Sequence, residues 1–388
     1  MEQVGRKELK KKERTTSGFW QTGKMDITFF ALVCILLTSG LLMLFSASYA
    51  YALAYFNNSY HFISKQLIFA VIGLVGMLFV SKINYRIYRK FAWLIYGISV
   101  ILLALLLILP PMVEGATQKR WFAIGPITFQ PSEIAKFAVI LLFAHLISKN
   151  YKKMETFKFG IATLGGLLGL VCALVVVETH LSATILIFCI GIILMIVGGI
   201  KARYIVGGLG VGVGAAAILV VSGVVSYGSD RFAYWLDPWA DAAGKGYQTI
   251  QSLLAIGSGG VLGRGFGQSR QKYLWVPEPH NDFIFSIVCE ELGLIGAIVI
   301  ILLFCALVWR GFIIAMKAPD KFGSLMCVGL AFQVGIQAVL NILVVTNTVP
   351  NTGISLPFFS YGGTALVLLM LQMGVVLSIS RSSNIEKA

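Results

Sequence analysis

The sequence has 388 residues, of which 57% are apolar and only 12% charged, with a formal net charge of +14. A mean hydropathy of +0.84 over this length excludes an ordinary soluble domain, in which about 25% of residues are charged. The six cysteines form no CxxC pair, so neither a disulfide framework nor a structural zinc site is indicated. The chain is therefore predicted to be an all-α, polytopic integral membrane protein.

A window of about 19 residues finds apolar segments long enough to cross a hydrocarbon core of roughly 30 Å. We predict ten spans, at residues 26–48, 62–81, 91–110, 131–148, 159–177, 181–199, 204–225, 283–309, 322–345 and 359–380. The stretch "GYQTIQSLLAIGSGG" between the seventh and eighth spans is predicted to be a short helix on the outer surface rather than an eleventh span.

The positions of the basic residues predict the orientation. Most of the 31 Lys and Arg residues lie in the two tails and in alternate loops, and cytoplasmic segments collect such residues. Both termini are therefore predicted to be cytoplasmic, with a basic tail over 1–25, a membrane domain over 26–380 and a tail over 381–388. The long loop 226–281 is predicted to be extracytoplasmic. The run "RKELKKKER" is interpreted as a topology signal near anionic headgroups, and no nucleic-acid partner is expected.

The ionisable residues near the spans gather towards the predicted outer side. Glu133 and Lys136 open the fourth span three residues apart, on one helix face and within reach of each other. A neutralised structural ion pair and a part of a functional site explain them equally well. Glu178 and His180 lie in the turn between the fifth and sixth spans, where a solvated loop is favoured over catalysis.

Acids also occur in the stretch "VPEPHNDFIFSIVCEELG" at the start of the eighth span. Asp282 is predicted to begin this helix, with Asn281 as its cap. Asp282, Ser286 and Glu290 fall at i, i+4 and i+8 and form one stripe, which requires a polar cavity or a partner helix. Glu291, about 100° round the helix from Glu290, is expected to face another helix.

The outer loop before this span is basic and rich in glycine. It holds Lys245, Arg264, Arg270 and Lys272 and no acid from 242 to 277. Backbone amides freed by glycine, together with guanidinium groups, suit a phosphate or diphosphate, while a flexible solvated loop is the alternative. The string "GRGFGQ" is not a dinucleotide fingerprint, because no βαβ unit surrounds it. The later stretch "NTVPNTGISLPFFSYGGTA" either breaks the tenth span or forms an ordered outer loop that lines a site.

Three classes of function fit a cationic outer loop beside a carboxylate at a helix mouth. They are an enzyme that acts on a lipid-linked phosphate at the outer leaflet, a transporter or flippase for such a lipid, and a noncatalytic scaffold. Transporters place their charged sites near the midplane, between corresponding repeats. No convincing repeat is visible and the charges lie near the outer surface, so the enzyme is favoured.

Three strings resemble the signature segments of the shape, elongation, division and sporulation (SEDS) family, which includes FtsW, RodA and SpoVE. They are "KRWFAIGPITFQPSEIAK", "LDPWADAAGKGYQTIQSLLAIGSGGVLGRGFGQSRQKYLWVPEPHNDFIFSIVCEELG" and "NTGISLPFFSYGGTA", at 119–136, 236–293 and 351–365. The resemblance covers essentially the whole membrane portion. "GQSRQK" and "PEPHNDFIF" look more like the division (FtsW) or sporulation (SpoVE) branch than the elongation (RodA) branch.

The resemblance implies a peptidoglycan glycosyltransferase that polymerises lipid II into β-1,4 glycan strands at the outer face of the bacterial cytoplasmic membrane, at the division septum. It implies as partners lipid II, undecaprenyl-diphosphate-linked glycan, a class B penicillin-binding protein that crosslinks the strands, and other divisome proteins. A lipid II flippase, or an elongation or sporulation paralogue, is the alternative. The family's essential aspartate falls on Asp282, and its Arg-Trp and Pro-Ser-Glu regions place Arg120, Glu133 and Lys136 beside the same cavity.

The chemistry implied by this family is inversion in a single displacement, with Asp282 as the general base for the acceptor hydroxyl. The groups expected to bind the substrate and its diphosphate are Arg120, Glu133, Lys136, Arg264, Arg270 and Lys272. The expected supporting residues are His280, Asn281, Ser286 and Glu290. A divalent cation, Mg²⁺ or Mn²⁺, between Asp282 and the diphosphate is left open.

Overall fold

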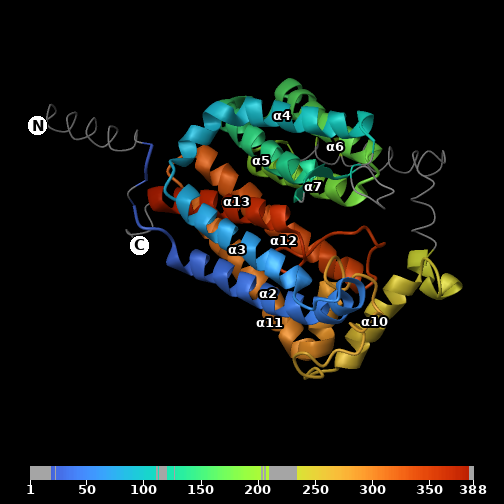
Figure 1. Ribbon diagram of the computed structural model, residues 1–388. Helices are drawn as coiled ribbons and strands as arrows, with labels where there is room; N and C mark the ends of the chain where they lie inside the picture. The colour runs from blue at the N-terminus through green and yellow to red at the C-terminus, as the bar shows by residue number, and fades with distance from the viewer. Residues whose placement is uncertain are drawn as a thin grey trace, which may run out of the picture.

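The computed structural model describes residues 19–21, 23–110, 112, 120–125, 127–201, 204, 207–208 and 234–383. Within these residues the protein is nearly all helical, and the long helices lie side by side in a bundle (Figure 1). The long helices are α2 (Ile27–Phe56), α3 (His61–Val80), α4 (Tyr88–Ile108), α5 (Pro131–Lys149), α6 (Leu164–Val177), α7 (Leu181–Val197), α11 (Ile284–Met316), α12 (Lys321–Val345) and α13 (Gly363–Ser382). The shorter elements are the strands β1 (Phe122–Ile124) and β2 (Ile127–Phe129), the helix α10 (Tyr247–Gly259), 3₁₀ turns at Tyr85–Ile87, Tyr151–Lys153 and Pro238–Asp241, and a π turn at Lys158–Thr163.

Eight helical segments of the described chain are long and apolar enough to cross a membrane, and α7 is a further apolar helix of 17 residues. The prediction of a polytopic, α-helical integral membrane protein is confirmed. The predicted seventh span, 204–225, lies largely outside the described residues, so the total of ten stays a prediction. The first helix runs on to Phe56, and the last begins at Gly363, four residues later than predicted.

Burial separates central from peripheral helices. In α5, 72% of the residues in the most apolar window are buried, and in α13 67%, against 22% in α3. Peripheral helices expose large apolar side chains such as Val75, Ile101 and Leu302. Such exposure is stable in a bilayer, because lipid tails are as apolar as these side chains. The buried face of α5 therefore marks the interior of the bundle.

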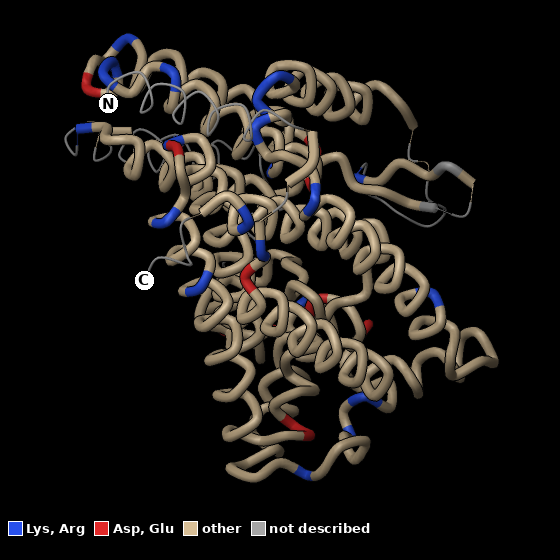
Figure 2. The backbone as a smooth tube through the Cα atoms, turned by 90° about the vertical axis from the view of Figure 1, so that its left-hand side faces the viewer, with Lys and Arg blue, Asp and Glu red and all other residues tan. Residues whose placement is uncertain are grey.

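The bundle has two distinct ends. The terminal end carries the start of α2 and the end of α13 (Figure 1), and Lys and Arg occur at many of its helix ends (Figure 2). There Arg310 at the end of α11 forms an ion pair of 2.8 Å with the buried carboxylate of Asp26, which caps α2. The loop end, formed by residues 247–283 and 346–362, carries Asp282. The assignment of the loop end to the extracytoplasmic side stays a prediction.

The helix α11 is interrupted at Gly293, which has φ 66° and ψ −170°. The chain that follows α10 lies against this break, where Leu294 donates its N–H to the carbonyl of Gly260 at 3.0 Å. A side chain on Gly293 would overlap the backbone of Gly263, so the close approach requires glycine. The nine residues 284–292 thus form a separate segment at the loop end.

The predicted surface helix is present as α10, but it packs on α11 with one face buried, including Ile250 and Ala255. A hairpin of β1 and β2, with Phe122 opposite Phe129, is the small exception to the predicted all-α fold. Strands of three residues give no periodic signal, so the sequence did not predict them.

Candidate active site

The predicted pair at the start of α5 is formed. Lys136 Nζ lies 2.8 Å from Glu133 Oε1, and Lys136 is only 1% exposed. Pro131 occupies the first turn of α5, where its missing N–H costs no hydrogen bond, and Glu133 lies in the same turn. Lys136 also donates to Gln337 Oε1 on α12 at 3.2 Å, so two helices hold one buried ammonium group.

Amide side chains on α12 connect this pair to Asp282. Gln333, Gln337 and Asn341 are spaced by four residues and share one helix face. Gln337 donates to the carbonyl of Ser355 at 3.0 Å, and Asn341 donates to the carbonyl of Asp282 at 2.7 Å. These three residues were not predicted to belong to the site, although the regular spacing of amides in the apolar span "QVGIQAVLN" indicates a polar helix face.

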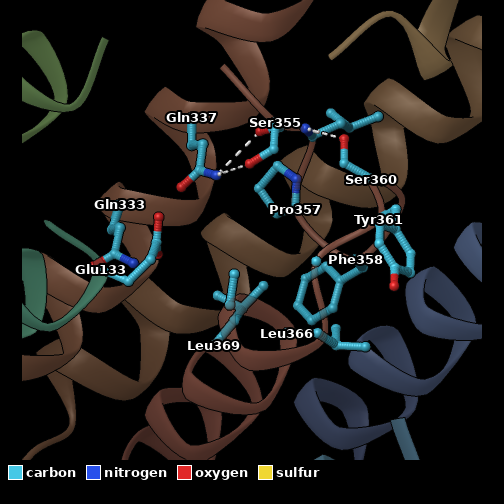
Figure 3. A pocket seen from close by; sticks show the side chains of 13 residues that line it. Glu133, Gln333, Gln337, Ser355, Pro357, Phe358, Ser360, Tyr361, Leu366 and Leu369 are labelled. Atoms are coloured by element: carbon cyan, nitrogen blue, oxygen red, sulfur yellow. Dashed lines mark hydrogen bonds between the residues drawn. The ribbon is translucent and has the colours of Figure 1, made fainter. Parts of the chain in front are cut away.

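A cavity opens beside the Lys136 pair (Figure 3). Glu133, Gln333 and Gln337 line one part of it, and the opposite part is apolar, with Leu366 and Leu369 from α13. The loop 355–362 completes the wall of the cavity. Of the two alternatives for the stretch after α12, the structure therefore shows the ordered loop that lines a site, and α13 begins at Gly363, after this loop. A cavity with a charged edge and an apolar wall suits a ligand with a polar head and a hydrocarbon chain.

Asp282 is half-buried and precedes α11, which begins at Ile284. The predicted helix start and cap are wrong, because Phe283 occupies the cap position without a side-chain hydrogen bond and Asn281 Nδ2 donates to Glu278 Oε2 at 2.9 Å. Asp282 therefore does not belong to the helical stripe predicted with Ser286 and Glu290. A Cβ on Gly353, which has φ +71°, would lie 3.2 Å from Asp282 Oδ2, so the loop after α12 lies close to this carboxylate.

Glu290 and Glu291 are buried and hold the basic loop. Glu290 accepts from the backbone N–H of Arg270 at 2.9 Å, and Arg264 Nε lies 3.6 Å from the same carboxylate. Glu291 accepts from Ser46 Oγ of α2 at 2.6 Å, as expected for a side chain that faces another helix. Ser286, also buried, donates to its own helix at the carbonyl of Phe283. The polar side chains of Ser286, Glu290 and Glu291 therefore form hydrogen bonds with other parts of the protein and do not face a cavity.

Lys272 is 3% exposed and its Nζ has three partners, Glu291 Oε1 at 3.0 Å, Ser46 Oγ at 3.0 Å and the carbonyl of Gly267 at 2.7 Å. Its ammonium group is enclosed by these three partners, and its predicted contact with the diphosphate stays a prediction. Arg264 is likewise engaged with Glu290 and with the carbonyl of Ser258. Arg270 is exposed at the surface of the loop, and its predicted contact with substrate stays a prediction.

Arg120 does not line the cavity beside Glu133. Its Nη2 donates to the carbonyl of Thr179 in the turn between α6 and α7. Glu178 and His180 in this turn are 4% and 8% exposed, so the expected solvated loop is wrong. Burial raises the pKa of Glu178 to about 8, against the opposite effect of Arg120.

The same turn is tied to the loop after α12, because Ser182 Oγ donates to the carbonyl of Thr352, next to Gly353. His280 supports the site by packing, with its ring centroid 4.1 Å from that of Phe62 and 4.9 Å from that of Tyr51. Burial lowers the pKa of His280 to about 4, so this ring is neutral at pH 7.

A divalent cation beside Asp282 would need further oxygen ligands. Within the part of the chain that the structure describes, no three His, Cys, Asp or Glu side chains converge as metal ligands. Mg²⁺ is commonly held by one or two carboxylates together with substrate phosphates and water, so a cation between Asp282 and the diphosphate stays a prediction.

Sequence comparison places the chain among known proteins. The family model described as "Cell cycle protein", which unites FtsW, RodA and SpoVE, matches residues 26–385. Stage V sporulation protein E of Bacillus subtilis is 38% identical over 359 residues, which cover 92% of this chain and 97% of that protein. A probable peptidoglycan glycosyltransferase FtsW of Geobacter metallireducens is 36% identical over 92% of this chain and 95% of its own length.

Comparison with solved structures points to the same family. A chain of a peptidoglycan synthase complex, described as coordinating polymerisation and crosslinking, superposes with a TM-score of 0.74 at 29% identity, over 92% of this chain and 98% of its own. The rod shape determining protein RodA of Thermus thermophilus gives a TM-score of 0.69 at 26% identity, over 93% and 98%. With a family model that spans nearly all of its membrane domain, this chain belongs to the FtsW, RodA and SpoVE family of integral membrane proteins.

Proposed function

We propose that this protein is a peptidoglycan glycosyltransferase that polymerises lipid II at the outer face of the cytoplasmic membrane, with Asp282 as general base. Relatives that match over nearly their whole length bear the name peptidoglycan glycosyltransferase. The observation that carries the assignment is that one face of α12 contacts both charged residues. Asp282 is held by Asn341, and the buried Lys136 is held by Gln337 one helical turn away.

The geometry suits an inverting transfer. The Asp282 carboxylate accepts the proton of the acceptor sugar's 4-hydroxyl while that oxygen bonds to the donor's anomeric carbon, and the bond to the undecaprenyl diphosphate breaks. Lys136 supplies positive charge near the leaving diphosphate, shared with Glu133. The apolar wall of Leu366 and Leu369 offers a surface for the polyprenyl chain, which stays in the membrane.

The test is Asp282→Asn in the purified full chain, with Asp237→Asn, in the segment before α10, as a matched control. Losing a general base lowers the rate by about 10² to 10⁴, so glycan polymer from lipid II should fall by that factor while the control polymerises normally. Polymer length on a gel distinguishes a transferase from a lipid II flippase. Near-normal polymer from Asp282→Asn would overturn the assignment.

For the partner, we propose a class B penicillin-binding protein, because a solved chain of the same fold belongs to a complex that polymerises and crosslinks. A septal role in division or sporulation is favoured by the relatives named FtsW and stage V sporulation protein E. A fluorescent fusion in the native cell should concentrate at septa, and an even signal along the lateral wall would contradict this role. Co-purification with the transpeptidase tests the partner.

A further inference from the structure

Three consecutive backbone carbonyls before α11 each receive a hydrogen bond from the C-terminal part of the chain. The three bonds run from Tyr361 N–H to His280 O at 2.9 Å, from Ser360 Oγ–H to Asn281 O at 2.8 Å and from Asn341 Nδ2–H to Asp282 O at 2.7 Å. Fixing successive peptide groups removes the local freedom that a segment outside a helix normally retains. The main chain of Asp282 is therefore placed by residues about 60 to 80 positions further along.

Among these donors Asn341 has a special geometry. It is fully buried, and its Nδ2 also donates to the carbonyl of Ile354 at 2.6 Å. A planar amide group fixes its two N–H directions, so one side chain sets the separation between Asp282 and the chain at Ile354. Gly353, the neighbour of Ile354, lies close to the same carboxylate, since a Cβ on it would lie 3.2 Å from Asp282 Oδ2.

The acceptor atom of Asn341 shows which half of the amide matters. Its Oδ1 is buried and has no hydrogen-bond partner among the described residues. A buried acceptor without a partner costs stability, so the benefit of an amide here lies in its two N–H groups. Gln337 lies four residues earlier on the same face and holds Lys136, which places the two anchoring points about 6 Å apart along α12.

We propose that Asn341 is a positioning residue for Asp282, which sets the place of this carboxylate relative to the acceptor hydroxyl and to Lys136. The inference rests on the proposed function, because it assigns Asp282 the role of base. A base must lie within about 2.6 to 3.2 Å of the proton it removes, and a displacement of 1 Å can cost about 10² in rate. The effect should fall on turnover rather than on substrate affinity.

The experiment compares Asn341→Leu, which keeps the branching at Cγ and removes both donors, with Gln372→Met. Gln372 on α13 is also a buried amide. It accepts a hydrogen bond from Gln333 on α12 and does not contact Asp282. With lipid II and the full chain, kcat of Asn341→Leu should fall about 100-fold with KM within about threefold. The control should keep kcat within about threefold, after both have shown comparable melting temperatures.

A positioning role also predicts non-additivity. In an Asp282→Asn background, Asn341→Leu should cost less than threefold more, because both changes act through one carboxylate. Additive losses, or an unchanged kcat in folded Asn341→Leu, would overturn the proposal. If Asn341→Leu does not fold, Ser360→Ala decides in its place, since it removes the donor to Asn281 and should lower kcat about tenfold. An active Asp282→Asn single variant would instead refute the proposed function.

Discussion

Lys272→Met tests whether the basic loop serves the fold or the substrate. The change removes the ammonium group that lies 3.0 Å from the buried carboxylate of Glu291. Removing one partner of a buried ion pair typically costs about 3 to 5 kcal/mol. Ser46 and the N–H of Gly267 still donate to Glu291, so we expect the lower end, about 3 kcal/mol.

The melting temperature converts this cost into an observable. An unfolding entropy of about 2.1 cal/mol/K per residue gives about 0.8 kcal/mol/K for 388 residues. The loss of about 3 kcal/mol then lowers Tm by at least about 4 °C, because helices that persist in detergent reduce the unfolding entropy. Differential scanning fluorimetry of the purified protein measures the shift.

The double variant Lys272→Met/Glu291→Gln provides the decisive comparison. It removes the unpaired charge and keeps an oxygen that can accept from Ser46. If Lys272 serves the fold, the double variant should recover at least half of the lost stability and polymerise lipid II at near the wild-type rate. A double variant that regains Tm but remains inactive would refute the structural role and restore Lys272 to the substrate site.

Three further outcomes are expected. Lys136→Met should abolish polymerisation, and adding Glu133→Gln should restore Tm but not activity; a double variant that polymerises would contradict a diphosphate role for Lys136. Gly353→Ala adds a Cβ 3.2 Å from Asp282 Oδ2 at φ +71°, so it should cost about 1 to 2 kcal/mol in Tm measurements and lower kcat; unchanged kcat would show that the loop does not constrain the carboxylate. The pKa of Glu178 is raised from 4.5 to about 8, so folding retains a proton that the unfolded chain loses and stability falls as pH rises between these values; the Tm gain of Glu178→Gln should grow over that range, and a constant gain would contradict it.

Hydropathy predicted most of the bundle because crossing a bilayer demands only length and an apolar composition. The pair of Glu133 and Lys136 was equally predictable from the sequence, since a separation of three residues on a helix brings two side chains together whatever surrounds them. The start of α11 was not predictable in this way, because the backbone around Asp282 takes its hydrogen bonds from Asn341 and residues 360–361 rather than from a local cap.

The partners of the basic loop were missed for a related reason. Arg264 and Lys272 were predicted to be free to bind substrate, and Glu290 was predicted to belong to a polar stripe on a span. Each prediction leaves a charge without a partner, although an unpaired charge near the membrane is costly in free energy. About twenty residues and a reversal of the chain separate them, and no local pattern encodes that reversal. An excess of buried acid beside an excess of loop base was nevertheless a signal that the two needed pairing.

The break at Gly293 divides α11 into two mechanical parts. Residues 284–292 are bonded to the loop through Glu290 and Glu291, whereas the long remainder of α11 reaches the ion pair of Arg310 with Asp26 at the opposite end. The loop is also bonded beyond the break, where Leu294 and Ile295 donate to the carbonyls of Gly260 and Val261 at 3.0 and 3.2 Å. Across the break the loop takes the place of the hydrogen bonds that the helix would make with itself, because the carbonyls of Glu290 and Glu291 accept from Arg264 and Gly265 instead, so the loop holds the two parts of α11 together.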